Sequence, residues 1–206
     1  EENVDLLIAG ALQKENLVQY YKGSIARKLS RKASCSLLLL THPEIESRHC
    51  NNVMVNGLEH PKTADTIKMA VHMANVFNSN QLTVVEEVEP NKIKNRADDD
   101  ISVVKASREK ASIERIEKKR LQDILSGVPI NENLRIKDKI IFGKPGYTIG
   151  HFAEKSHVDL LVLNSPDTKL GIFDRVFTHN LEYILSDLPT DLLIVHTTKK
   201  TANGSA

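Results

Sequence analysis

The run Asp159-Leu160-Leu161-Val162-Leu163-Asn164 decides the fold, because its central positions are all apolar and do not alternate with polar residues. Parallel strands that are covered by helices on both faces have this pattern. Similar runs recur along the chain, and the predicted strands are 5–10, 36–41, 52–56, 81–88, 139–143, 159–164 and 191–196. The predicted helices are 24–32, 63–77, 101–126, 147–155 and 178–188. This alternation predicts an α/β protein with an open, doubly wound parallel sheet.

An internal repeat divides the chain. Asp5-Leu6-Leu7-Ile8 recurs as Asp159-Leu160-Leu161-Val162, and Ser36-Leu37-Leu38-Leu39 recurs as Asp191-Leu192-Leu193-Ile194, at offsets of 154 and 155 residues. The predicted organisation is therefore the C-terminal part of a first repeat, a complete second domain and a tail, at residues 1–50, 51–198 and 199–206. Because three more strands precede the second copy and nothing precedes the first, we expect the chain to be a fragment that lacks an upstream half-domain.

Composition excludes several classes of protein. The 206 residues carry a net charge of +1, so there is no basic excess to bind nucleic acid. The two cysteines form neither a disulfide framework nor a metal-binding pair, which favours a reducing, cytoplasmic setting. No stretch approaches the roughly 20 apolar residues of a membrane helix, so we expect this part of the protein to be soluble.

Several segments match one family in order along the chain. They are 53–59 (VMVNGLE), 85–90 (VEEVEP), Gly143-Lys144-Pro145 and the strand that begins at Asp159. In these segments the chain resembles the universal stress protein family in a tandem arrangement. The resemblance implies the adenine-nucleotide alpha-hydrolase-like fold, with five parallel strands in the order 3-2-1-4-5, helices on both faces and a partial second copy. It also implies pairing through the last strands, with the second repeat or in a homodimer.

The ATP-binding branch of that family carries a spaced glycine motif: Gly, two residues, Gly, nine residues, then Gly-Ser or Gly-Thr. Bare backbone lets phosphate oxygens approach N–H groups, and the last pair begins a helix whose dipole favours anions. The first copy reads Gly10, Gln13 and Gly23-Ser24, so only the middle glycine is lost. A structural alternative is that Gly10 ends a strand and Ser24 caps a helix.

The second copy departs further from the motif. It reads Asn164, Asp167 and Thr178-His179, and the acid that the family has in its first turn is Asn56. A carboxylate beside a phosphate is unfavourable, so we expect this domain not to bind a triphosphate. An uncharged or cationic ligand, or none, fits better. The resemblance implies a ligand pocket formed by Gly10, Gly23, Ser24, Asn56, Gly57, Gly143, Pro145, Asn164, Thr178 and His179. Capping, turn and surface roles are the structural alternatives.

Three functions compete. The first is a non-enzymatic regulatory or sensory module, the second a slow ATPase, and the third a pure assembly domain that pairs through its last strands. The sequence has no obvious general base, nucleophile motif or metal set, so we expect no enzyme, no catalytic residue and no metal. We also expect no bound cofactor, and ATP or AMP is the one candidate that stays open.

A finer resemblance narrows the first hypothesis. Residues 56–63 (NGLEHPKT), 143–151 (GKPGYTIGH) and 174–183 (DRVFTHNLEY) look similar to the cytosolic tails of bacterial cation/proton antiporters. This resemblance implies a regulatory domain on the cytosolic face of a membrane, in the same chain as a transporter. The alternative is a free-standing tandem universal stress protein that binds ATP or another adenine nucleotide.

Overall fold

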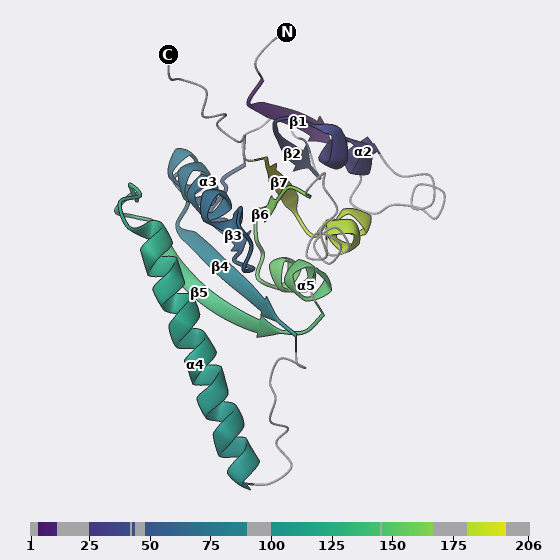
Figure 1. Ribbon diagram of the computed structural model, residues 1–206. Coiled ribbons are helices and arrows are strands. Elements are labelled where there is room, and N and C mark those ends of the chain that lie inside the picture. The colour runs from purple at the N-terminus through teal and green to yellow at the C-terminus, as the bar shows by residue number, and fades with distance from the viewer. Residues whose placement is uncertain are drawn as a thin grey trace, which may run out of the picture.

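The computed structural model describes residues 4–11, 25–41, 43, 48–89, 100–144, 146–166 and 181–196. Its centre is one sheet of seven strands in the order β1-β2-β7-β6-β3-β4-β5, shown in Figure 1. The strands are β1 Leu6–Gly10, β2 Ser36–Leu40, β3 Asn52–Asn56, β4 Gln81–Val88, β5 Arg135–Phe142, β6 Leu160–Asn164 and β7 Asp191–Val195. The helices are α2 Ile25–Lys32, α3 Thr63–Val76, α4 Asp100–Leu125 and α5 Tyr147–Lys155, and residues 181–186 are also helical.

The sheet as a whole has seven strands and is mixed, so it departs from the predicted five-stranded parallel sheet. The five strands β5-β4-β3-β6-β7 are parallel neighbours as predicted, and the antiparallel pairing comes from β2. Strand β2 pairs antiparallel with β7, with Leu38 opposite Leu193 at the centre of the register. This pairing joins the last predicted strands of the two repeats and extends the sheet to β1. All other neighbours are parallel, and on the far side of β7 the strands follow in the order β6-β3-β4-β5.

Each face of the sheet carries its own apolar core. Leu161 and Leu163 of β6 point into the core under α2, α5 and residues 181–188, while Leu160 and Val162 point into the core under α3 and α4. Because successive side chains of a strand alternate between faces, a strand buried on both faces must be apolar at every position. This explains the uninterrupted run, and each such buried side chain contributes about 1.5–3 kcal/mol.

Strand β5 begins earlier than the sequence predicted. The predicted strand starts at residue 139, whereas β5 starts at Arg135 and pairs with β4 along its whole length. Its exposed positions include Arg135, Lys137 and Asp138, because β5 is an edge strand with a single neighbour in the sheet. The apolar-run criterion fails for such a strand. The other predicted boundaries that fall on described residues agree with the structure to within two residues; the largest difference is the predicted helix 178–188, which ends at residue 186.

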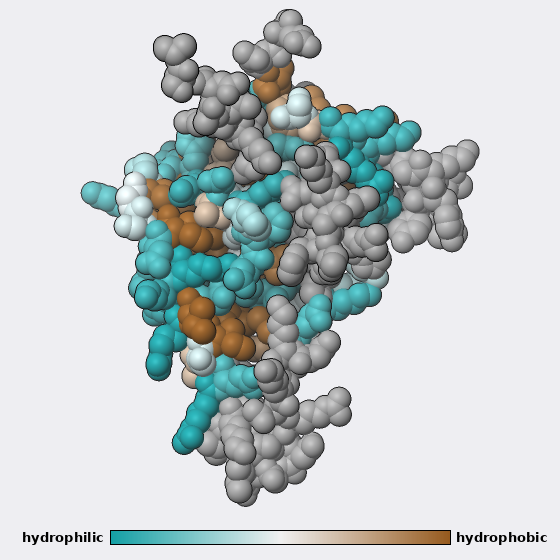
Figure 2. Space-filling view, in the orientation of Figure 1, coloured by the Kyte–Doolittle hydropathy of each residue, from teal (hydrophilic) through white to brown (hydrophobic). Residues whose placement is uncertain are grey.

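The surface agrees with this layering. Figure 2 shows a mostly hydrophilic surface with separate hydrophobic patches, one of them at the top, over the start of β1. Val4, Leu6 and Ile8 are exposed there. Helix α4 runs along the sheet and extends well beyond it (Figure 1). Among the described helices, none combines the length and apolar character needed to cross a membrane.

Candidate functional site

The strand order reverses between β3 and β6. From β3 the chain moves to β4 on one side, and it later returns to β6 on the other side. In open α/β sheets, ligands bind outside the carboxyl ends of the strands at such a switch point. Asn56 and Asn164 are the last residues of β3 and β6, and both are buried. The structure therefore brings these two predicted site residues to the position where a ligand is expected.

The side chains of this crevice bond to one another. Nδ2 of Asn164 donates to Oγ1 of Thr63 at 3.2 Å, and the Thr63 hydroxyl donates to the carbonyl oxygen of Leu58. Oδ1 of Asn56 accepts from the N–H of Leu58 at 2.9 Å. Oδ1 of Asn164 is buried and has no hydrogen-bond partner among the described residues. The first glycine position of the spaced motif is thus filled by a bonded amide.

Lys62 places a cation beside the crevice. Its Nζ lies 3.3 Å from Oγ and 3.4 Å from the carbonyl oxygen of Ser165, the residue that follows β6. His196, just after β7, lies close enough to respond to this charge. Burial lowers the pKa of His196, and the charge of Lys62 lowers it further. The neutral imidazole is therefore favoured. No pattern in the sequence predicts that Lys62 and His196 lie close together.

Gly57 has a structural reason to be glycine. A Cβ at this position would lie 2.9 Å from Cγ1 of Val84, closer than real side chains approach. Its N–H donates to the carbonyl oxygen of Val85 at 2.7 Å. Arg120 of α4 donates to the Gly57 carbonyl oxygen and pairs with Glu86 at 2.9 Å. Gly57 lies at the switch point, and its contacts within the protein are enough to explain why this residue is glycine.

Gly143 is also fixed by packing. A Cβ there would lie 2.2 Å from Oγ1 of Thr148 in the first turn of α5. The same turn is capped by Glu87 of β4, whose carboxylate accepts from the N–H groups of Gly146 and Ile149 at 2.8–3.1 Å. Burial raises the pKa of Glu87, and these two hydrogen bonds partly oppose the rise. Glu87 was not among the predicted site residues; the adjacent acids Glu86 and Glu87 within a largely apolar, buried strand were the available signal.

The remaining predicted site residues are distributed differently. Gly10 ends β1 and is separated from β3 by β2, β7 and β6 in the sheet. It therefore does not line the crevice that contains Asn56. A Cβ on Gly10 would meet no atom of the described residues within 4 Å. Outside the described residues lie Gln13, Gly23, Ser24, Pro145, Asp167, Thr178 and His179. Within the described part of the chain, no group of three His, Cys, Asp or Glu side chains could hold a metal ion.

Comparisons with known proteins identify the fold. No family model matches the chain, and no curated protein sequence matches it. A universal stress protein from Archaeoglobus fulgidus DSM 4304 superposes with a TM-score of 0.62 at 9% identity, over 96% of this chain and 62% of that one. A functionally unknown protein from Pseudomonas aeruginosa PAO1 gives 0.57 at 14% identity, over 92% and 62%. Universal stress protein UspA from Lactobacillus plantarum gives 0.51 at 20% identity, over 73% of this chain and all of that one. The chain therefore has the fold of these proteins, and it spans less than two thirds of the first two.

Proposed function

We propose that this chain, which has the universal stress protein fold, is a non-enzymatic regulatory or sensory module of that family whose switch-point pocket does not take a nucleoside triphosphate. The observation that supports this proposal is the hydrogen bond from Asn164 to Thr63 across the crevice. In an ATP-binding relative, the residue at the end of this strand is glycine, and phosphate oxygens approach its bare backbone. Here a buried side chain occupies that approach.

The positive charge of Lys62 in the crevice is the main observation that favours phosphate binding. Lys62 favours an anion, but its Nζ already lies within hydrogen-bond distance of Ser165. A phosphate would have to replace those contacts and displace the Asn164 amide, which costs about 1–3 kcal/mol for each buried polar group left without a partner. An uncharged or cationic ligand brings no phosphate into the crevice and avoids this cost.

A free-standing tandem protein that binds ATP or AMP is the second candidate. One observation favours it: among the described residues Gly10 has no packing reason to be glycine, because a Cβ there would meet none of their atoms within 4 Å. Together with the Gly23-Ser24 spacing in the sequence, this leaves the first copy as the better nucleotide site. That site would be complete only with further strands beside β1, which has a single neighbour here.

We further propose that the module belongs to the cytosolic side of a cation/proton antiporter and regulates or assembles it. Two of the three segments that carry this resemblance, 56–63 and 143–151, begin at or just after the carboxyl ends of β3 and β5, and the first of them begins at the switch point. The transport chemistry would then lie outside these residues. The reading frame of the parent gene tests this part directly: about ten apolar segments of about 20 residues upstream would support it, and their absence would refute it.

Thermal unfolding in the presence of Mg-ATP or AMP tests the pocket. We expect no rise in Tm with either nucleotide at millimolar concentration. A nucleotide present at 100 times its Kd would stabilise the protein by about 2.7 kcal/mol, which is easily measured. Stabilisation that grows with the logarithm of nucleotide concentration would overturn the proposal. In that case Lys62→Gln would locate the site, because loss of the effect would place the nucleotide in the switch-point crevice.

A further inference from the structure

A second candidate site lies at the other end of the strands, away from the carboxyl ends of β3 and β6. A cavity of about 630 Å³ opens where the carboxyl end of β2 meets the amino ends of β6 and β7. We call it the amino-end cavity; its inner wall includes Leu38, Cys50, Val158, Asp159, Leu160 and Asp191. Its volume falls within the range of about 300–1,000 Å³ that is usual for small-molecule sites. Both predicted repeats contribute to it, and it is separate from the crevice at Asn56 and Asn164.

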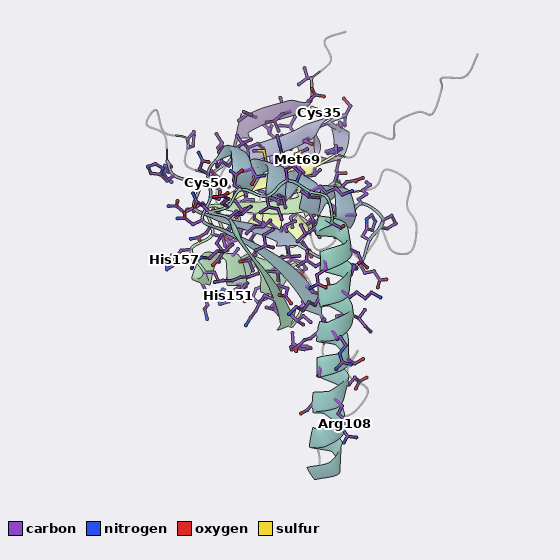
Figure 3. The ribbon with its side chains drawn as sticks, turned by 90° about the vertical axis from the view of Figure 1, so that its left-hand side faces the viewer. Cys35, Cys50, Met69, Arg108, His151 and His157 are labelled. Atoms are coloured by element: carbon purple, nitrogen blue, oxygen red, sulfur yellow. The ribbon has the colours of Figure 1, made fainter. Side chains whose placement is uncertain are left out.

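Part of the inner wall is apolar. Leu38, Val158 and Leu160 line the cavity and are otherwise buried in the protein. The exposed residues Arg48, His49, Glu154 and His157 lie at its rim. Figure 3 shows Cys50 and His157 near the same edge of the molecule, with Cys35 elsewhere. The interior can therefore accept an apolar group, while the rim is polar.

Two carboxylates lie within the same wall, each held through one oxygen. Oδ2 of Asp159 accepts from the N–H groups of Asn51 and Asn52 at 2.8 Å. Oδ1 of Asp191 accepts from the N–H and the hydroxyl of Thr41, also at 2.8 Å. The second oxygen of each carboxylate accepts no hydrogen bond within the described residues. These hydrogen bonds fix both side chains and leave one acceptor of each for a ligand.

The pKa of the Cys50 thiol depends on its burial and on the negative charge in the cavity. Burial is the largest cause that raises its pKa to about 11, and the negative charges of Asp159 and Asp191 add to the rise, opposed in part by a hydrogen bond from Ser79. Both carboxylates therefore act on the same point of the wall. At neutral pH the thiol is protonated and uncharged, so the charge of the inner wall comes from the two carboxylates.

We propose that the amino-end cavity binds a small organic cation with an apolar body, such as a primary amine on an aromatic or branched aliphatic group. The ammonium donates to the open oxygens of Asp159 and Asp191, and the apolar body packs against Leu38, Val158 and Leu160. An ammonium carries three donors, which suits two carboxylates at once. An anion of the same shape is repelled by both carboxylates. The inference does not depend on the proposed function, because the two sites lie at opposite ends of strand β6.

Calorimetric titration with three molecules of similar shape tests the charge selection. The probes are 2-phenylethylamine, 2-phenylethanol and 3-phenylpropionate at neutral pH. We expect the amine to bind with a Kd near millimolar, the alcohol to bind about tenfold more weakly, and the acid not to bind. Equal binding of amine and alcohol, preferred binding of the acid, or no saturable binding of the amine would each overturn the proposal.

Charge-neutralising variants locate the site. Asp159→Asn and Asp191→Asn each keep an oxygen that can accept the backbone N–H groups, and each should weaken the amine about tenfold. The matched control is Asp138→Asn, which removes the same charge from an exposed position on β5 and should leave the affinity unchanged. An equal loss in all three variants would mean that only net charge matters, and would refute the site.

The two cysteines give a readout that needs no Asp variant. Reaction with methyl methanethiosulfonate, which modifies thiols and not amines, followed by mass spectrometry, measures the modification of Cys50 and Cys35 in the same molecule. Both are free thiols. Saturating 2-phenylethylamine should slow the reaction of Cys50 several-fold and leave that of Cys35 unchanged. If the amine binds but protects neither cysteine, or both equally, it binds elsewhere and the proposal fails.

Discussion

Asn164 and Thr63 are hydrogen-bonded across the switch point of the sheet, 3.2 Å from Nδ2 to Oγ1, with both side chains almost fully buried. One residue ends β6 and the other begins α3, so the bond closes the gap between the strand end and the helix that covers it. In open α/β sheets, ligands bind outside the carboxyl ends of the strands at such a gap. Here the protein's own polar groups satisfy one another.

Replacing the two partners should have unequal effects. Asn164→Ala removes a donor and an oxygen that already lacked a partner, while the Thr63 hydroxyl still bonds to Leu58. We expect a loss of about 1 kcal/mol in the free energy of unfolding. Thr63→Val keeps the shape but leaves two buried polar groups without partners, and should cost about 2–3 kcal/mol. Urea unfolding measures both, and a larger loss in Asn164→Ala would contradict this account.

Glu87→Gln should change how stability depends on pH. Burial raises the folded-state pKa of Glu87 above its ordinary value of 4.5, so its contribution to stability is full below about pH 4.5 and is lost as pH rises through the folded-state pKa. Glutamine cannot ionise but keeps one oxygen for the N–H groups of Gly146 and Ile149. We expect the unfolding free energy of the wild type, relative to the variant, to fall as pH rises from 4.5 towards neutral. A difference that is independent of pH would contradict the assignment.

The two ends of the β2–β7 pair should differ in strength. Asp191 accepts two hydrogen bonds from Thr41 at 2.8 Å, whereas Ser36, its equivalent in the first repeat, accepts one from the N–H of His196 at 3.3 Å. We expect Asp191→Ala to cost about 2–3 kcal/mol and Ser36→Ala about 1 kcal/mol or less. Asp191→Asn, which keeps the acceptor, is the control. Equal losses in urea unfolding would show that the longer bond is as strong.

Lys62→Met should raise the pKa of His196. Burial is the first cause of its lowered pKa and remains in the variant, while the charge of Lys62, the second cause, is removed. A lowered folded-state pKa gives stability that is present above the unfolded-state value, about 6.5, and is lost as pH falls through the folded-state pKa. The variant should therefore lose less stability on acidification. Histidine NMR titration checks the shift, with His151 on α5 as the internal reference; an unchanged His196 would contradict it.

The local pattern of the sequence was sufficient to predict the presence of the described helices and strands in residues 51–198. Strands such as Leu160–Asn164 are apolar at every position because both faces are buried, and that constraint is visible in the sequence itself. The same constraint does not apply to β5, whose exposed edge admits charged residues, so its start was predicted too late. The meeting of Asn56 and Asn164 at the switch point also followed from strand order, since both residues end neighbouring parallel strands.

The sequence by itself determined the α/β class, the repeat and the loss of the glycine at residue 164, because burial and backbone freedom are properties of short segments. Only the tertiary structure decided that β2 runs antiparallel to β7, that Glu87 caps α5, and that Asp159 and Asp191 share a cavity. These contacts join residues far apart in the chain. They depend on how whole elements pack against each other, and no periodicity in the sequence encodes that packing.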